Sequence, residues 1–253
     1  MSKRKTGALR NNDTKFNSKK DSQKYYETKT IQFDSNRPKP SSHIQLVPKT
    51  VNQEAYILAL LNPSIDIVVA GGPAGTGKTY LAMQAAIKAM KAQTCDKIIL
   101  TRPAVGVDDE KHGFLPGDLN AKMEPWTRPL LDVLREYYTQ KEITHMLEEQ
   151  IVEIAPLAFC RGRNFKQSYV ILDEAQNCTP SQIKMIMTRI GEGSKIVITG
   201  DIEQADRKTK DNGLMDLQER LKSYDVPGLR LCQFDVKDIQ RHQIIQHVLK
   251  LYQ

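Results

Sequence analysis

The chain has 253 residues, of which 40% are hydrophobic and 26% are charged, a composition typical of a folded globular protein and not of a disordered or fibrous one. No apolar run approaches the roughly 20 residues that cross a bilayer, and the polar start has no signal-peptide core, so we expect a cytoplasmic protein. Four widely spaced cysteines form no C-x-x-C pair, which favours reduced thiols over disulfides or a zinc site.

The positive charge is concentrated at one end of the chain. Residues 1–50 carry twelve Lys and Arg against four Asp and Glu, a net charge of +8, whereas the remaining residues carry 25 against 26. This first segment is rich in Ser, Asn, Lys and Gln and poor in aliphatic residues, so it cannot bury enough apolar surface to fold alone. We therefore expect a disordered basic tail over residues 1–46 and one folded domain over residues 47–253.

Predicted helices and strands alternate along this domain. Apolar residues at helical spacing predict a helix over residues 47–61, before Asn62-Pro63. A short β-branched run over residues 65–70 predicts a strand buried on both faces, and a helix rich in Ala, Leu and Met follows at 78–93. Further strands are expected at residues 97–101, 169–172, 195–199 and 229–234.

A helix between two of these strands carries clear start and stop signals. Thr179 and Gln182 have the spacing of a capping box, and apolar residues recur at helical spacing from Ile183 to Ile190, before Gly191. Residues 105–160 are less regular, with a helix expected at 128–146. Strand–helix–strand units with short links predict an α/β fold: a parallel sheet with helices on both faces.

The segment after the first predicted strand fits the phosphate-loop pattern G-x-x-x-x-G-K-[ST]. Its residues are Gly72, Pro73, Ala74, Gly75, Thr76, Gly77, Lys78 and Thr79. The glycines allow successive backbone N–H groups to surround an anion, and the following helix adds the positive end of its dipole. Lys78 can contact the outer phosphates, and the Thr79 hydroxyl can bind Mg²⁺. The alternative, a glycine-rich turn without a ligand, is disfavoured by the flanking strand and helix.

Two carboxylates follow the strand predicted at residues 169–172. Asp173 is expected to help hold Mg²⁺, and Glu174 to polarise a water for attack on a γ-phosphate. The alternative is that the pair only caps the next helix. A carboxylate that activates water favours hydrolysis over phosphate transfer to another substrate, and the sequence has no N-K-x-D string, which favours ATP over GTP.

Two further polar features are candidates for sensing the γ-phosphate. Thr199, Asp201 and Gln204 follow another predicted strand, and parallel strands bring such ends to one edge of the sheet. Gln204 can donate to a phosphate oxygen or orient water. Arg241 lies on the apolar stripe of the predicted last helix, in the first turn, where the helix dipole disfavours a cation. We interpret it as an arginine finger or sensor; an arginine that only reaches solvent is the alternative.

In combination, these motifs resemble the PhoH-like family, whose ATPase core is similar to that of superfamily 1 helicases. The resemblance runs from about Val47 to Tyr252 and rests on the strings GGPAGTGKTYLA, TRPAV, GFLPGD, FCRGR, VILDEAQN, TGD and RH. It implies a P-loop NTPase with a single RecA/helicase-like core that binds ATP through residues 72–79, with Asp173 and Glu174 as the Walker B pair.

The resemblance also implies roles for residues outside the phosphate loop and the Walker B pair. Gln53 would read adenine, Gln204 would sense the γ-phosphate, and Arg241 would contact a phosphate. Arg102 would lie near the nucleic-acid path, and Arg161 and Arg163 would serve either nucleotide or RNA. The charged stretch after Gln204 departs from the family pattern.

The leading hypothesis is an ATPase coupled to binding or unwinding of single-stranded nucleic acid, with RNA favoured over DNA. The basic tail places Phe16, Tyr25, Tyr26 and Phe33 among its lysines, so phosphate attraction and base stacking are both available; a solvated tail without a partner is the alternative. A single core lacks a second motor domain, so we expect a homo-oligomer, with a hexameric ring as one form, in which Arg241 or Arg163 reaches a neighbour's nucleotide.

Two other classes of function stay open. One is a nucleotide-dependent switch or assembly protein that hydrolyses ATP slowly. The other is a metal-dependent ribonuclease that uses Asp173, Glu174 or Asp201, or an accessory protein of such an enzyme.

Overall fold

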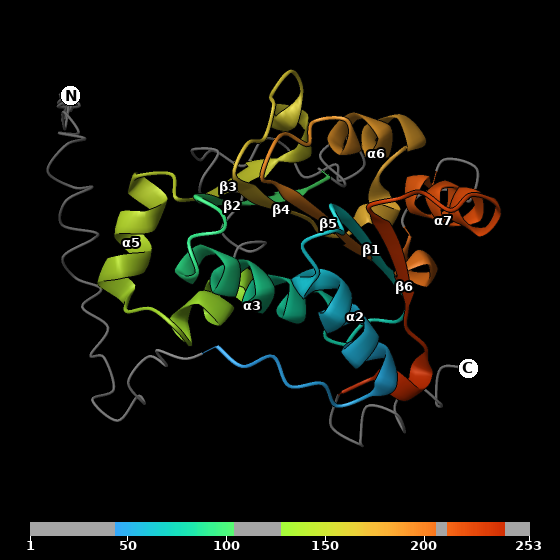
Figure 1. Ribbon diagram of the computed structural model, residues 1–253, viewed down its shortest axis with the longest axis horizontal. Coiled ribbons are helices and arrows are strands. Elements are labelled where there is room, and N and C mark those ends of the chain that lie inside the picture. Colours follow the sequence, from blue (N-terminus) through green and yellow to red (C-terminus); the bar gives the residue numbers. More distant parts are fainter. Residues whose placement is uncertain (1–43, 104–127, 206–211, 241–253) are drawn as a thin grey trace, which may run out of the picture. The chain divides into compact units, whose positions relative to one another are not determined.

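Six parallel strands form the centre of the computed structural model, which describes residues 44–103, 128–205 and 212–240 (Figure 1). The order of the strands across the sheet is β3-β2-β4-β5-β1-β6, and every described pairing is parallel. Their bounds are β1 (Ile67–Gly71), β2 (Lys97–Arg102), β3 (Val152–Pro156), β4 (Ser168–Leu172), β5 (Lys195–Gly200) and β6 (Leu229–Gln233). The carboxyl ends of these strands therefore share one edge, where β5 separates β1 from β4.

Helices cover both faces of the sheet, as expected. On one side lie α2 (Val51–Leu61) and α3 (Lys78–Lys91), and on the other lie α6 (Pro180–Met187) and α7 (Gly213–Ser223) (Figure 1). Helix α5 (Gln140–Glu148) packs beside β3. None of the helices in the described ranges has the length and hydropathy needed to span a bilayer.

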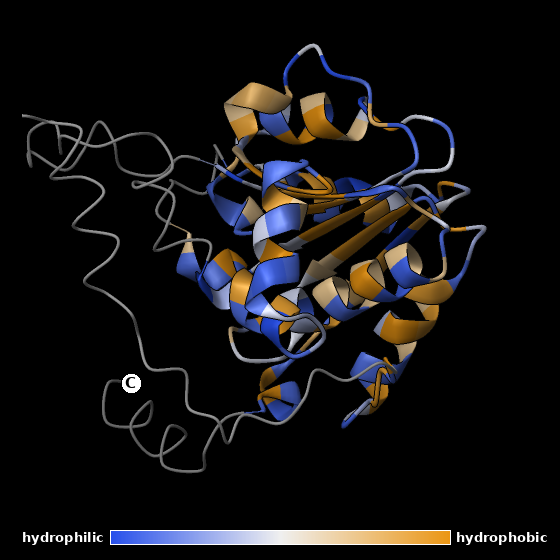
Figure 2. Ribbon diagram, turned by 90° about the vertical axis from the view of Figure 1, so that its left-hand side faces the viewer, coloured by the Kyte–Doolittle hydropathy of each residue, from blue (hydrophilic) through white to orange (hydrophobic). Residues whose placement is uncertain are grey.

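Alternation along the strands explains the two helical layers. Val68 and Ala70 of β1 belong to the core cluster under α2 and α3, whereas Val69 between them belongs to the cluster under α6 and α7. Successive side chains of a strand point to opposite faces, and fully burying a Val, Leu or Ile side chain contributes ~1.5–3 kcal/mol. In Figure 2 the strands are accordingly mostly hydrophobic, while the helices are mixed. Ile44 and Leu46, which precede the expected domain boundary, are also buried in the first cluster.

Three details differ from the sequence-based expectations. The capping box of Thr179 and Gln182 is present, but α6 ends at Met187, because Ile190 leaves the helix to form an isolated parallel bridge with Phe165. The single helix expected at residues 128–146 is wrong: a helical stretch at 128–135 is followed by α5, which begins at a capping box of Thr139. Strand β3 is not among the strands that the sequence predicts, because residues 105–160 show a less regular pattern.

Candidate nucleotide site

The phosphate loop connects β1 to α3 in a backbone shape that requires glycine. Gly75 and Gly77 have φ values of +83° and +84°, a left-handed region that side chains disfavour. At Gly72, where φ is +140°, a Cβ atom would lie 2.4 Å from the Phe234 carbonyl oxygen. Gly77 also precedes the first residue of α3, so the loop ends at a helix N-terminus, as an anion site requires.

The Lys78 side chain lies within the curve of this loop. Its Nζ donates to the carbonyl oxygens of Gly72 and Pro73, both at 2.7 Å, and to Thr76 Oγ1 at 3.2 Å. Only 7% of Lys78 is exposed. An ammonium group held against the loop in this way is placed to meet phosphate oxygens that bind to the loop's N–H groups.

Two buried side chains of α2 donate hydrogen bonds to the backbone of the phosphate loop and of the first residue of α3. Gln53 Nε2 donates to the Thr76 carbonyl at 3.0 Å, and its Oε1 accepts from the Lys49 N–H at 2.8 Å. The Tyr56 hydroxyl donates to the Lys78 carbonyl at 3.2 Å, and burial raises the pKa of this hydroxyl well above its ordinary value. The structure thus places Gln53 in contact with the loop itself; its adenine-reading role stays a prediction.

Thr79 and Asp173 meet directly at the carboxyl edge of the sheet. Thr79 Oγ1 donates to Asp173 Oδ1 at 2.8 Å, and Thr199 Oγ1 at the end of β5 donates to the same oxygen at 2.7 Å. Mg²⁺ prefers oxygen ligands and takes one or two carboxylates with waters and substrate phosphates, so the hydroxyl and carboxylate present here fit that ion. No group of three or more His, Cys, Asp or Glu that could hold a metal occurs in the described part of the chain.

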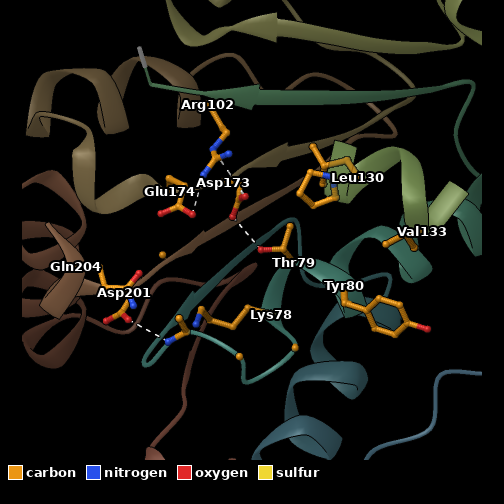
Figure 3. A pocket seen from close by; sticks show the side chains of 15 residues that line it. Lys78, Thr79, Tyr80, Arg102, Leu130, Val133, Asp173, Glu174, Asp201 and Gln204 are labelled. Carbon is orange, nitrogen blue, oxygen red and sulfur yellow. Dashed lines mark hydrogen bonds and ion pairs between the residues drawn. The ribbon is translucent and has the colours of Figure 1, made fainter. Parts of the chain in front are cut away.

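Glu174 is held by two side chains and by an unusual backbone conformation. Its φ and ψ are +55° and +40°, the left-handed region, which costs a residue with a Cβ ~1–2 kcal/mol. Oε1 pairs with Arg102 Nη2 at 2.7 Å, and Oε2 accepts from Gln176 Nε2 at 2.5 Å. Arg102 Nε also lies 3.9 Å from Asp173 Oδ2. Arg102 therefore faces both carboxylates of the site (Figure 3).

Gln176 is a site residue that the sequence analysis did not single out. Its side chain is almost fully buried, and its Oε1 accepts from the Asp201 N–H at 3.1 Å. The Asp201 carboxylate in turn accepts from the Ala74 N–H at 3.0 Å. A continuous hydrogen-bond chain therefore joins Glu174 to the phosphate loop. Only the position of Gln176, two residues after Glu174 on the segment that leaves β4, could have suggested this role.

The residues expected to sense the γ-phosphate differ in how the structure places them. The Thr199 and Asp201 side chains are engaged with Asp173 and with the loop, respectively. Gln204 lies on an exposed 3₁₀ turn and lines the same cavity as Lys78. Arg241 lies outside the described residues.

A cavity of about 430 Å³ brings these groups together, a volume within the range of ligand pockets. One wall consists of the phosphate loop and the polar side chains at the strand ends, and the opposite wall is apolar. The residues that line it include Lys78, Thr79, Tyr80, Arg102, Leu130, Val133, Asp173, Glu174, Asp201 and Gln204 (Figure 3).

The two other candidate arginines do not line this cavity. Arg163 makes two hydrogen bonds to the Glu153 carboxylate, the second at 2.7 Å between Nη2 and Oε2, and its guanidinium lies 5.2 Å from the Phe165 ring centroid. This pairing holds the pKa of Glu153 below its ordinary value. Arg161 is exposed. The structure thus engages Arg163 within its own chain, and it leaves Arg161 at the surface.

Comparisons with known proteins show the family of the chain and agree with its fold. The model of the family described as "PhoH-like protein" matches residues 45–253. A PhoH-like protein of Synechocystis is 45% identical over 81% of this chain and 61% of its own length. A PhoH-like protein of Bacillus subtilis is 43% identical over 92% of this chain and 71% of its own length. Protein PhoH of Escherichia coli is 39% identical over 75% of this chain and 53% of its own length. The chain thus spans less than two thirds of two of these three relatives.

Among solved structures, the large terminase of a thermophilic bacteriophage matches with a TM-score of 0.50 and 9% identity, over 81% of this chain and 50% of that one. This likeness concerns the fold alone. The sheet order, the phosphate loop at the end of β1 and the acidic pair at the end of β4 together make the architecture that of an α/β P-loop NTPase. With its match over residues 45–253, the chain belongs to the PhoH-like protein family.

Proposed function

We propose that this protein is a magnesium-dependent ATPase whose hydrolysis is coupled to binding or unwinding of single-stranded nucleic acid, RNA more than DNA. The observation that carries the hydrolytic part is the placement of Glu174 beside the Thr79–Asp173 pair, on the cavity that Lys78 also lines. Phosphoryl transfer needs little more than positioning and charge stabilisation, and these residues supply both.

Each residue has a definite part in the proposed reaction. The loop N–H groups and Lys78 bind the outer phosphates, and Thr79 and Asp173 would hold Mg²⁺, which would neutralise charge that develops on the phosphate oxygens. A water oxygen forms a bond to the γ-phosphorus while the bond to the β,γ-bridging oxygen breaks, and ADP keeps that electron pair. Glu174 orients the water and accepts its proton, which later passes to the released phosphate.

The nucleic-acid part of the proposal rests on charge and aromatic residues in the sequence. The net charge of +8 over residues 1–50 provides attraction to a phosphate backbone, and the aromatic residues interspersed there suit base stacking. We extend the proposal to a homo-oligomer, because the described residues form one core with one phosphate loop. Sedimentation of the full chain with ATP as a species no heavier than the 28.7 kDa monomer would contradict this extension.

We expect single-stranded RNA to raise the rate of ATP hydrolysis, and the gain to fall steeply between 50 and 200 mM salt. The reason is that lysines and arginines that neutralise several backbone phosphates release counterions, so affinity depends strongly on salt, on the order of 10³-fold over this range for six contacts. Steady-state phosphate release with poly(U), with poly(dT) and without nucleic acid measures this effect.

The salt series without nucleic acid is the control, because it reports any salt sensitivity of the ATPase itself. Slow hydrolysis that neither polymer stimulates at any salt concentration would favour the second function, a nucleotide-dependent switch or assembly protein. None of the contacts among the described residues favours a ribonuclease, so we do not propose that activity.

A further inference from the structure

The two carboxylate oxygens of Glu174 are bound by two side chains that differ greatly in their exposure to solvent. Gln176, which holds Oε2, is 1% exposed, and its other amide end is bonded to the Asp201 N–H. Arg102, which holds Oε1, is the last residue of β2, and its side chain is 25% exposed. Gln176 can therefore keep its contact only as part of the buried network, whereas Arg102 can exchange its partner with something that arrives from solvent.

Arg102 approaches the acidic pair from the side away from the phosphate loop. In Figure 3 the carboxylates of Asp173 and Glu174 lie between Arg102 and Lys78. Arg102 and Lys78 line the same cavity, with the two carboxylates between them in this view. This arrangement favours a second anion, distinct from the phosphate held by Lys78 and the loop, as the group that takes Arg102 away from Glu174.

The pairing with Arg102 bears directly on the proposed reaction. A general base must offer an oxygen lone pair to the attacking water, and at 2.7 Å the guanidinium occupies the Oε1 side of the carboxylate. Guanidinium binds phosphate in the same forked geometry in which it binds carboxylate. Because both side chains are partly exposed, water screens their ion pair, and a phosphate can compete for the arginine.

We propose that Arg102 restrains Glu174, and that a backbone phosphate of single-stranded nucleic acid releases it by binding the guanidinium. Oε1 is then free to accept the proton of the attacking water, while Gln176 keeps the carboxylate oriented. Arg102 is a positioning residue in this scheme, since it acts through Glu174. The inference rests on the proposed function, and it adds the step by which nucleic acid would reach the ATPase site.

The first test compares kcat and KM for ATP, with and without an oligouridine, in Arg102→Ala, Arg102→Lys and wild type. Positioned general bases contribute ~10²- to 10⁴-fold, so partial release should raise the unstimulated kcat of Arg102→Ala at least ~5-fold. We expect KM to stay within about 2-fold, stimulation by oligouridine to be lost, and Arg102→Lys to regain part of the restraint because an ammonium still pairs with a carboxylate.

Arg220→Ala is the matched control. It removes another arginine from a carboxylate, because Arg220 makes two hydrogen bonds to Asp216 on the surface of α7. This variant should behave as wild type. A lower kcat or a raised KM for ATP in Arg102→Ala, or stimulation equal to that of wild type, would overturn the inference. If wild type itself fails to hydrolyse ATP, the proposed function is wrong.

The second test measures oligouridine affinity by fluorescence anisotropy and needs no ATPase activity. Arg102→Ala should weaken binding by ~3-fold or more, on the scale of one lost phosphate contact. Glu174→Ala should tighten binding, because it frees Arg102. Asp216→Ala is its control, since it removes the same charge and frees Arg220 instead. If Glu174→Ala and Asp216→Ala raised the affinity for oligouridine equally, the gain would come from net charge alone and the inference would be overturned. This outcome can be read even if the protein does not hydrolyse ATP.

Discussion

The Glu174→Gln variant should bind ATP as wild type does and hydrolyse it at least ~10²-fold more slowly, the usual scale for the loss of a positioned acid–base group. The amide has nearly the size of the carboxylate, so it can fill the same space between Arg102 and Gln176. An amide does not accept a proton from water at neutral pH, so only the chemical step should suffer. Phosphate release at saturating ATP, together with ATP affinity from calorimetry, measures the two effects separately.

Glu203→Gln provides the control for this variant. Glu203 is an exposed glutamate on the 3₁₀ turn beside the site, and it does not line the cavity. The same chemical change at this position should leave hydrolysis unchanged. If Glu174→Gln hydrolysed ATP at the wild-type rate, Glu174 would not be the base, and the proposed mechanism would fail at its central step.

The Lys78→Ala variant should lose most of the affinity for ATP. Hydrogen bonds to charged groups contribute ~1.5–3 kcal/mol, so removal of the ammonium should weaken binding by about 10- to 100-fold, with a further loss in rate because the same group stabilises the transition state. Calorimetric titration with ATP in the presence of Mg²⁺ measures the first effect.

Lys88→Ala serves as the matched control, because Lys88 is an exposed lysine on the same helix, α3. It should bind ATP as tightly as wild type. Thermal unfolding of both variants checks that they remain folded, since Lys78 is buried within the loop. A folded Lys78→Ala protein that kept wild-type affinity would show that ATP binds elsewhere.

The features that lie in one short stretch of sequence could be predicted well. The phosphate loop is a contiguous pattern, and its glycines are required by the backbone itself, as Gly75 and Gly77 show. The start of α6 is likewise determined within four residues by the capping box of Thr179. The buried strands were evident because strands covered on both faces are hydrophobic throughout.

The contacts that complete the site depend on the order of the strands, which the sequence does not reveal. Asp201 and Ala74 are 127 positions apart, and they meet because β5 lies next to β1. For the same reason the role of Gln176 was missed: its partner, the Asp201 N–H, becomes a neighbour only when β4 and β5 pair.

Strand β3, which the sequence does not predict, also determines the surroundings of Arg163. Strand β3 lies at the edge of the sheet and is only partly buried, so its hydrophobic signal is weak. Glu153 in this strand is the partner of Arg163. Without this strand the sequence shows no partner for Arg163 in the chain, and nothing in it counters the nucleotide or RNA role that the family resemblance implies.

The most direct test of the central claim, that this site holds a magnesium-bound triphosphate and lets water cleave it, is phosphate release from ATP by the wild-type protein with Mg²⁺ and with excess EDTA. We predict steady release of inorganic phosphate that requires Mg²⁺ and that stops when EDTA removes the ion. A folded protein that released none, or that released phosphate equally well in EDTA, would contradict the account.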